Sequence, residues 1–216
     1  MNIILFGPPA AGKGTQADNI VKDFSLHKIS TGELLRNEVK NDTSLGKKIK
    51  SILEKGSLVS DEIIADLISK ILSNKFFFNR LIFDGYPRNL NQAKSLNFLI
   101  NKHNQKISCV LCLNVSADII VKRVLGRQVC SKCSLTFNEF FNPSTTENHK
   151  CGDKFLKKRS DDNEKTIKSR LETYNKVTSP IINYYSEQKM LHQINGMRKI
   201  EEIYEEIRGI IASLEA

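Results

Sequence analysis

A glycine-bounded loop near the start of the chain has the residue types of a phosphate site. It consists of Gly7, Pro8, Pro9, Ala10, Ala11, Gly12, Lys13, Gly14 and Thr15. This order is the Walker A pattern, except that Gly14 separates Lys13 from the hydroxyl of Thr15. In such a loop the backbone N–H groups and the positive start of a helix face an anion, and the lysine adds a mobile charge. A glycine turn with a solvated lysine is the alternative.

The flanking residues decide between these two hypotheses. The apolar run 3–6 predicts a buried strand before the loop, and apolar residues at helical spacing in 15–24 predict a helix after it. Strand, loop and helix in this order are the context that a phosphate-binding loop requires. We therefore predict that a nucleotide binds here.

An aspartate follows a second buried strand, predicted at 81–83. Asp84 directly precedes Gly85, Tyr86, Pro87 and Arg88. Ligands bind at the carboxyl edge of an open parallel sheet, and an acid at this position can hold Mg²⁺ directly or through water. An aspartate that opens a turn is the alternative; beside a Walker A loop we favour the metal role.

Six arginines stand out because they lie in separate segments. They are Arg36, Arg88, Arg123, Arg127, Arg159 and Arg170. A guanidinium group binds phosphate bidentately, and a nucleotide hydrolase usually needs one such arginine. Arg123 and Arg127 are predicted to share one helix face, where offsetting the helix dipole is the alternative role. The spread of the six indicates two phosphorylated ligands facing each other, and hence phosphoryl transfer onto a second phosphate compound.

The cysteines divide into two groups. Cys109 and Cys112 fall in a predicted strand, where residues three apart face opposite ways, so we assign them to the core. Cys130 and Cys133 form the first half of a zinc ribbon. The second half is incomplete: Cys151 is present, but Asn148 stands where its partner is expected. His149 is the candidate fourth ligand and Asp153 a weaker one, so structural zinc and a metal-free relic with reduced thiols both stay open.

Composition narrows the class of partner. The net charge is +9, from 33 basic and 24 acidic residues, but the lysines are spread along the chain without a basic tail. No apolar run approaches the ~20 residues that span a bilayer, and the first residues predict a strand instead of a signal peptide. The cysteine count is odd, at five. We expect a cytoplasmic protein with neither a nucleic-acid nor a membrane partner, and without a disulfide framework.

Hydrophobic periodicity predicts an α/β fold. The predicted strands are 3–6, 26–30, 81–83, 109–115 and 190–194. The predicted helices are 15–24, 33–39 with Thr31 as N-cap, 45–55 ending at Gly56, 60–72, 89–103, 116–126, 162–175, a segment after Pro180 that reaches 187, and 199–214. This alternation predicts a five-stranded parallel sheet with helices on both faces. We expect one domain, 1–216, with a helical insertion at 30–59 and a small β insertion at 126–162.

These residues together resemble the adenylate kinases of the long-lid bacterial type, along essentially the whole chain. The matching motifs are 7–16, 30–36, 83–88 with Gln92, 126–127, and 159–162 with Arg170. The block from Asp84 to Arg88, combined with the GKGT loop, is highly specific for nucleoside monophosphate kinases.

The resemblance implies Mg²⁺-dependent, reversible phosphoryl transfer from ATP to AMP, giving two ADP, by a monomer with a P-loop kinase core. The insertion 30–59 would bind AMP and the insertion 126–162 would form a lid over ATP. The ATP site would comprise Ala10, Ala11, Gly12, Lys13, Gly14, Thr15, Arg127, Thr136, Phe137 and Arg198. The AMP site would comprise Thr31, Arg36, Ser57, Leu58, Val59, Gly85, Tyr86, Pro87, Arg88 and Gln92, with Arg159 and Arg170 clamping the transferred phosphate. The catalytic set would be Lys13, Asp84, Arg88, Arg123, Arg159 and Arg170.

Two details depart from this family pattern or stay open. Ala10 replaces the usual glycine, which costs stability if that position requires positive φ. Phe137 either covers the adenine ring or packs inside the lid.

Three other functions are alternatives. A UMP/CMP or guanylate kinase would share the core, but Thr31 and Gln92 match the adenine type. A nucleic-acid-binding zinc ribbon would explain the charge and cysteines but not the arginines. An ATPase switch would hydrolyse ATP without an acceptor.

Overall fold

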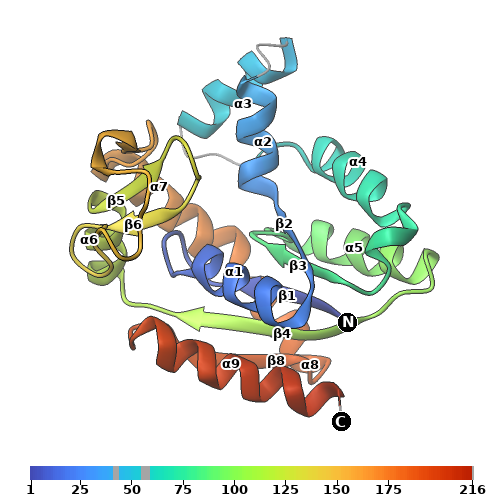
Figure 1. Cartoon of the computed structure of the whole chain (residues 1–216). Coiled ribbons are helices and arrows are strands. Elements are labelled where there is room, and N and C mark those ends of the chain that lie inside the picture. Colours follow the sequence, from blue (N-terminus) through green and yellow to red (C-terminus); the bar gives the residue numbers. More distant parts are fainter. Residues whose placement is uncertain (41–43, 55–58, 216) are drawn as a thin grey trace.

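A parallel sheet of five strands, in the order β2-β3-β1-β4-β8, forms the centre of the molecule (Figure 1). The computed structural model describes residues 1–40, 44–54 and 59–215. The strands are β1 (Asn2–Phe6), β2 (His27–Ser30), β3 (Leu81–Asp84), β4 (Ile107–Asn114) and β8 (Leu191–Asn195). This sheet confirms the predicted fold class. Strands β3 and β4 lie on opposite sides of β1, so the order in which strands are added to the sheet reverses at β1. Open parallel sheets bind ligands at such a point.

Strand β1 shows how the sheet separates two cores. All five of its residues are buried. Ile3 and Leu5 pack into the core on one face, and Ile4 and Phe6 pack into the core on the other, because successive side chains alternate along a strand. The same alternation places the buried thiols of Cys109 and Cys112 on opposite faces, which confirms the prediction.

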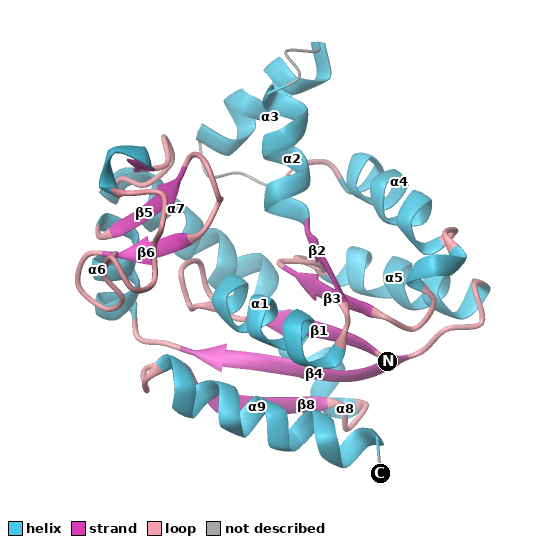
Figure 2. Cartoon of the chain, viewed as in Figure 1, coloured by secondary structure: helices cyan, strands magenta, loops and turns pink. Residues whose placement is uncertain are grey.

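Helices cover both faces of the sheet (Figure 2). One face is covered by α1 (Lys13–Phe24) and α9 (Ile200–Glu215), whose Ile20, Ile203 and Ile207 share a core with β1. The other face is covered by α4 (Asp61–Leu72), α5 (Leu90–Lys102) and α8 (Pro180–Glu187). Among the described residues, no helix combines the length and the apolar character that crossing a membrane requires.

Two helices extend from the end of β2, away from the sheet (Figure 1). They are α2 (Thr31–Lys40) and α3 (Ser44–Glu54). The predicted cap of α2 was wrong by one residue: Ser30 Oγ accepts the backbone N–H of Glu33 at 3.4 Å, and Thr31 is the first helical residue. The Thr31 hydroxyl donates to Gly85 O instead, at 2.9 Å. The predicted helix end at Gly56 lies outside the described residues.

A small antiparallel sheet follows α6 (Ala117–Leu125). Its strands, in the order β6-β5-β7, are β5 (Arg127–Cys130), β6 (Thr136–Asn138) and β7 (Leu156–Lys157). Helix α6 ends before Arg127, so the prediction that Arg123 and Arg127 share a helix face was wrong. Asn138 Nδ2 donates to Arg123 O at 2.7 Å, and a Cβ on Gly126 would lie 2.6 Å from the Phe140 ring. These contacts end the helix where the small sheet begins.

The chain returns to the core through a modified helix. It consists of α7 (Glu164–Thr173), a π-helical turn (Tyr174–Thr178) and then α8. Ser179 N donates to Tyr174 O at 2.8 Å, the five-residue spacing of a π-helix. Pro180 therefore begins α8 after a widened turn, because it has no N–H to continue an ordinary helix.

Candidate active site

The glycine-bounded loop connects β1 to the start of α1. Lys13 Nζ donates to Gly7 O and Pro8 O, each at 2.8 Å, so the lysine folds back over the loop. Gly7 has φ +142°, and a Cβ there would lie 2.8 Å from Leu113 O, so only glycine fits. Gly12, the N-cap residue of α1, has no side chain to cover the N–H groups at the helix start. The loop therefore presents bare backbone donors and one lysine, which suit a phosphate.

Ala10 adopts φ 58°, the left-handed conformation that favours glycine. Ala10 therefore adopts an unfavourable backbone conformation, as expected if this position requires positive φ. Its methyl group packs against the core formed by Ile120, Val124 and Ile167, which partly offsets the cost of this conformation.

Asp84 ends β3 beside this loop, and a Cβ on Gly14 would lie 3.7 Å from Asp84 Oδ2. Burial lowers the pKa of Lys13 to about 8, while the negative charge of Asp84 opposes that change. Burial likewise raises the pKa of Asp84, and the positive charge of Lys13 opposes it. The two groups thus stabilise each other's charges at the sheet edge, where a metal and a phosphate would meet both.

A second pocket lies beside Gly85, the residue that follows Asp84 in the chain. It is lined by Thr31, Leu35, Val59, Ile64, Gly85, Tyr86, Arg88 and Gln92. Arg88 Nε donates to Gly85 O at 2.7 Å, and Thr178 Oγ1 donates to Arg88 O at 2.8 Å. Gly85 has φ +73°, and a Cβ on it would lie 3.1 Å from the Arg88 guanidinium. The pocket thus combines apolar walls with one fixed arginine.

Arginines from several elements surround the space between the loop and this pocket. Burial, together with the charge of Arg170, lowers the pKa of Arg88 to about 10. Burial also lowers the pKa of Arg159 to about 10, with contributions from the charges of Arg127 and Arg36. The five guanidinium groups therefore lie close enough to interact electrostatically. Buried cations at this density favour a polyanionic ligand.

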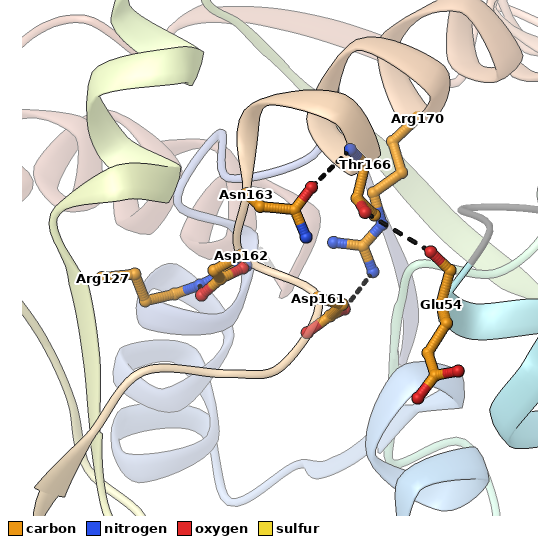
Figure 3. A network of polar contacts seen from close by, with 7 residues as sticks. All are labelled: Glu54, Arg127, Asp161, Asp162, Asn163, Thr166 and Arg170. Carbon is orange, nitrogen blue, oxygen red and sulfur yellow. Dashed lines mark hydrogen bonds and ion pairs between the residues drawn. The ribbon is translucent and has the colours of Figure 1, made fainter.

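Two neighbouring aspartates hold two of these arginines (Figure 3). Arg127 makes two hydrogen bonds to Asp162, one of them from Nε to Oδ2 at 2.8 Å. Arg170 Nη2 donates to Asp161 Oδ2 at 2.7 Å. Burial tends to raise the pKa of Asp161, but Arg170 and the arginines nearby hold it below its ordinary value. Asp161 therefore stays charged, and the two aspartates orient Arg127 of β5 and Arg170 of α7.

Arg123 is held differently from the other arginines. It donates to Ala11 O at 3.1 Å and to Gly196 O at 2.9 Å, and its guanidinium carbon lies 5.3 Å from the centre of the Phe141 ring. It therefore joins the phosphate loop to the β8–α9 turn and to the lid.

The remaining predicted nucleotide contacts lie at the margins of the site. Thr136 is exposed on β6, and Arg198 is exposed and pairs with Glu206. Phe137 is buried, with its ring centre 4.8 Å from that of His149, which is the arrangement expected of lid packing. Ser57 and Leu58 lie outside the described residues, whereas Val59 is buried at the second pocket.

The lid also brings together the four predicted metal ligands. Ligand atoms of Cys130, Cys133, His149 and Cys151 all lie within 4.8 Å of one another. Burial opposes ionisation of Cys130, but the backbone N–H groups of Cys133 and Lys132, together with His149, lower the pKa of this thiol to about 6. A thiolate is the form that binds metal. Asp153, the weaker candidate, is not in the cluster; its carboxylate accepts a hydrogen bond from the Ser144 hydroxyl at 2.9 Å.

A family model described as adenylate kinase matches residues 5–190 of this chain. The chain belongs to the adenylate kinase family. It is 48% identical to the adenylate kinase of Pelagibacter ubique over 98% of this chain and 99% of that protein. It is 37% identical to the adenylate kinase of Enterococcus faecalis, over 98% and 99% of the two chains. It is 36% identical to that of Limosilactobacillus reuteri, over 99% and 100%. This chain is therefore an adenylate kinase-type enzyme of nucleotide phosphoryl transfer.

The sequence analysis gave no role to three side chains of this adenylate kinase fold that position the predicted groups. Asp161 pairs with Arg170, Asp61 accepts hydrogen bonds from Asn89 and Gln92, and Ser144 contacts His149 at 3.0 Å. Asp61 lies in the first turn of α4, where an acidic residue is common because it offsets the helix dipole. A polar residue near a helix start gives no sequence signal for a partner that lies far along the chain.

Proposed function

We propose that this enzyme transfers the γ-phosphoryl group of ATP to AMP, with Mg²⁺, and forms two ADP. The observation that carries this proposal is that two places near Asp84 each offer a cation that would bind a phosphate. The loop around Lys13 forms one, and the pocket around Arg88 forms the other. An ATPase needs only the first. The family membership supports the same reaction.

The chain's residues suit transfer between two phosphates. A phosphate oxygen of AMP is already an anionic nucleophile, so the reaction requires no general base. The work left is alignment and neutralisation of charge on the migrating group. Lys13, Arg88, Arg123, Arg159 and Arg170 would supply the positive charge. Asp84, beside the loop, would hold Mg²⁺ directly or through water; the bound ion would neutralise phosphate charge.

The two insertions take complementary roles in this proposal. Residues 30–59 would enclose AMP, and residues 126–162 would close over ATP as a lid. Closure excludes water, which would otherwise accept the phosphoryl group. A monomer working in the cytoplasm is sufficient for this scheme.

The direct test measures ADP formation from MgATP with and without AMP, using CMP, UMP and GMP as alternative acceptors. The proposal expects two ADP for each ATP consumed, only when AMP is present. Turnover with CMP or UMP instead would reassign the acceptor, and ATP loss without any acceptor would overturn the transfer reaction. Lys13→Ala should reduce turnover at least about a hundredfold, whereas Lys22→Ala, an exposed lysine of α1, should not change it.

We also propose that the lid holds a structural zinc ion through Cys130, Cys133, Cys151 and His149. The geometry of His149 supports this donor set. The Ser144 hydroxyl donates its proton to Asp153, so its oxygen accepts from His149 Nδ1–H. That fixes the tautomer in which Nε2 carries a lone pair. Nε2 is buried and has no hydrogen-bond partner among the described residues, as a metal ligand would be before binding.

A further inference from the structure

The side-chain amide of Gln92 is held at both ends by partners of fixed hydrogen-bonding type. Its Oε1 accepts the backbone N–H of Arg88 at 2.7 Å, and its Nε2 donates to Asp61 Oδ1 at 2.7 Å. The side chain is buried, with 3% of its surface exposed. A backbone N–H can only donate and a carboxylate can only accept. The positions of the amide oxygen and nitrogen are therefore chemically determined.

Asp61 is itself fixed by a second amide. Asn89 Nδ2 donates to both carboxylate oxygens of Asp61, at 2.8 and 3.1 Å. Asn89 Oδ1 accepts the backbone N–H of Gln92 at 2.8 Å, so the orientation of this amide is determined as well. Asp61 lies at the start of α4, where the helix dipole favours its charge. It thus connects the start of α4 to the start of α5, beneath the second pocket.

Among the described residues, these contacts leave Gln92 with one free N–H and one free oxygen lone pair. Gln92 lines the pocket that Thr31, Tyr86 and Arg88 also form. A base that pairs with this amide must donate to the oxygen and accept from the nitrogen. A 6-aminopurine does so through its amino group and the adjacent ring nitrogen. A 6-oxopurine has the opposite pattern, with a carbonyl next to a ring N–H.

A 6-oxopurine could pair with Gln92 only if the amide turned over. Turning it over would point the Gln92 NH₂ group at the Arg88 N–H, and the Gln92 oxygen at the Asp61 carboxylate. Both contacts would then be repulsive in a buried place, where unpaired polar groups are costly. The two partners therefore oppose binding of the oxo base without touching it.

We propose that Asp61 is a specificity-determining positioning residue, which fixes the Gln92 amide so that the acceptor pocket selects 6-amino over 6-oxo bases. This inference rests on the proposed function, since it places the base of the acceptor nucleotide in the pocket beside Gln92.

The test replaces the carboxylate by a group of the same shape that can both donate and accept. In Asp61→Asn, the new amide can turn its NH₂ towards Gln92, which removes one of the two repulsive contacts of the turned-over Gln92 and leaves only the one with the Arg88 backbone N–H. We expect the ratio of kcat/KM for AMP over inosine monophosphate, measured with MgATP, to fall at least about tenfold. Glu62→Gln makes the same chemical change at the next, exposed residue and should leave the ratio unchanged. A ratio within twofold of the parent in Asp61→Asn, even with a lower melting temperature, would overturn the proposal and leave Asp61 a merely structural role.

A second measurement separates this inference from the proposed function. In the nucleotide-free protein, the side-chain amide protons of Gln92 should exchange slowly with solvent by NMR. Exchange should become at least about tenfold faster in Asp61→Asn and in Asp61→Ser, but not in Glu62→Gln. Rapid exchange in the parent protein would overturn the proposal that Asp61 fixes the Gln92 amide. This measurement on the parent protein does not depend on whether any variant folds. Slow exchange in a protein that does not phosphorylate AMP would keep the fixed amide and reject only the proposed reaction.

Discussion

Arg127 and Asp162 form a buried ion pair with two hydrogen bonds, although 35 residues separate them in the chain. The Asp162 side chain is fully buried, whereas 14% of the Arg127 side chain is exposed. The pair ties the first strand of the lid to the segment that leads into α7 (Figure 3). The segment that begins β5 and the segment that precedes α7 are therefore joined directly.

This asymmetry in burial predicts unequal effects of breaking the pair. Arg127→Met leaves a buried carboxylate without its main partner, so the free energy of unfolding should fall by about 3 kcal/mol. Asp162→Asn keeps an acceptor oxygen and leaves a partly solvated arginine, so it should cost about 1 kcal/mol. Urea denaturation of both variants measures the difference. The double variant should be more stable than Arg127→Met alone; equal costs for the two single changes would contradict the argument.

The lowered pKa of Lys13 predicts an alkaline limit to activity. Burial lowers this pKa to about 8, so the free enzyme loses the Lys13 charge above that pH. kcat/KM for ATP should then fall about tenfold per pH unit above pH 8. In Lys13→Arg, the remaining kcat/KM for ATP should not decrease between pH 8 and pH 10, because arginine stays charged. If kcat/KM of Lys13→Arg decreased above pH 8 as in the parent enzyme, the titrating group would be another residue.

The same shift affects stability with the opposite sign. Between pH 8 and the ordinary lysine value of 10.5, the unfolded chain binds a proton that the native protein does not. Burial of charged Lys13 should therefore destabilise the nucleotide-free protein by a constant amount below pH 8, and this destabilisation should decrease as the pH rises across the window. Lys13→Met should lack this pH dependence. Comparing the pH dependence of urea denaturation in the two proteins isolates it.

Ala10 offers a test of backbone strain in the phosphate loop. Its φ of 58° disfavours alanine, whereas glycine adopts it freely. Ala10→Gly should raise the free energy of unfolding by about 0.5–1 kcal/mol, reduced by the lost methyl contacts. Ala11→Gly is the matched control: Ala11 is buried, its φ is not positive, and the change should destabilise. A loss of stability in both variants would show that the loop relieves the strain elsewhere.

The sequence predicted the parallel sheet because its strands are short apolar runs separated by helices, and local periodicity contains that information. It also placed Cys109 and Cys112 on opposite faces, since strand alternation alone decides this. It misplaced Arg127, because the end of α6 depends on Asn138 and Phe140, which come from the lid. It gave no role to Asp61, whose partners lie 28 and 31 residues away. Contacts that depend on tertiary packing produce no periodic pattern in the amino-acid sequence.

The lid cluster predicts a measurable zinc requirement for stability but not for the transfer chemistry. Native mass spectrometry should find one zinc ion per chain, and a chelator should lower the melting temperature, because metal binding adds directly to the stability of such a small sheet. His149→Gln should lose the ion, since His149 belongs to the cluster and its buried Nε2 has no hydrogen-bond partner in the described part of the chain. Ser144→Ala should weaken zinc binding about tenfold, because it removes the group that fixes the His149 tautomer. His103→Gln, outside the cluster, is the control. Full zinc retention in His149→Gln would exclude this histidine as a ligand, and a metal-free protein with an unchanged melting temperature would make the cluster a set of reduced thiols.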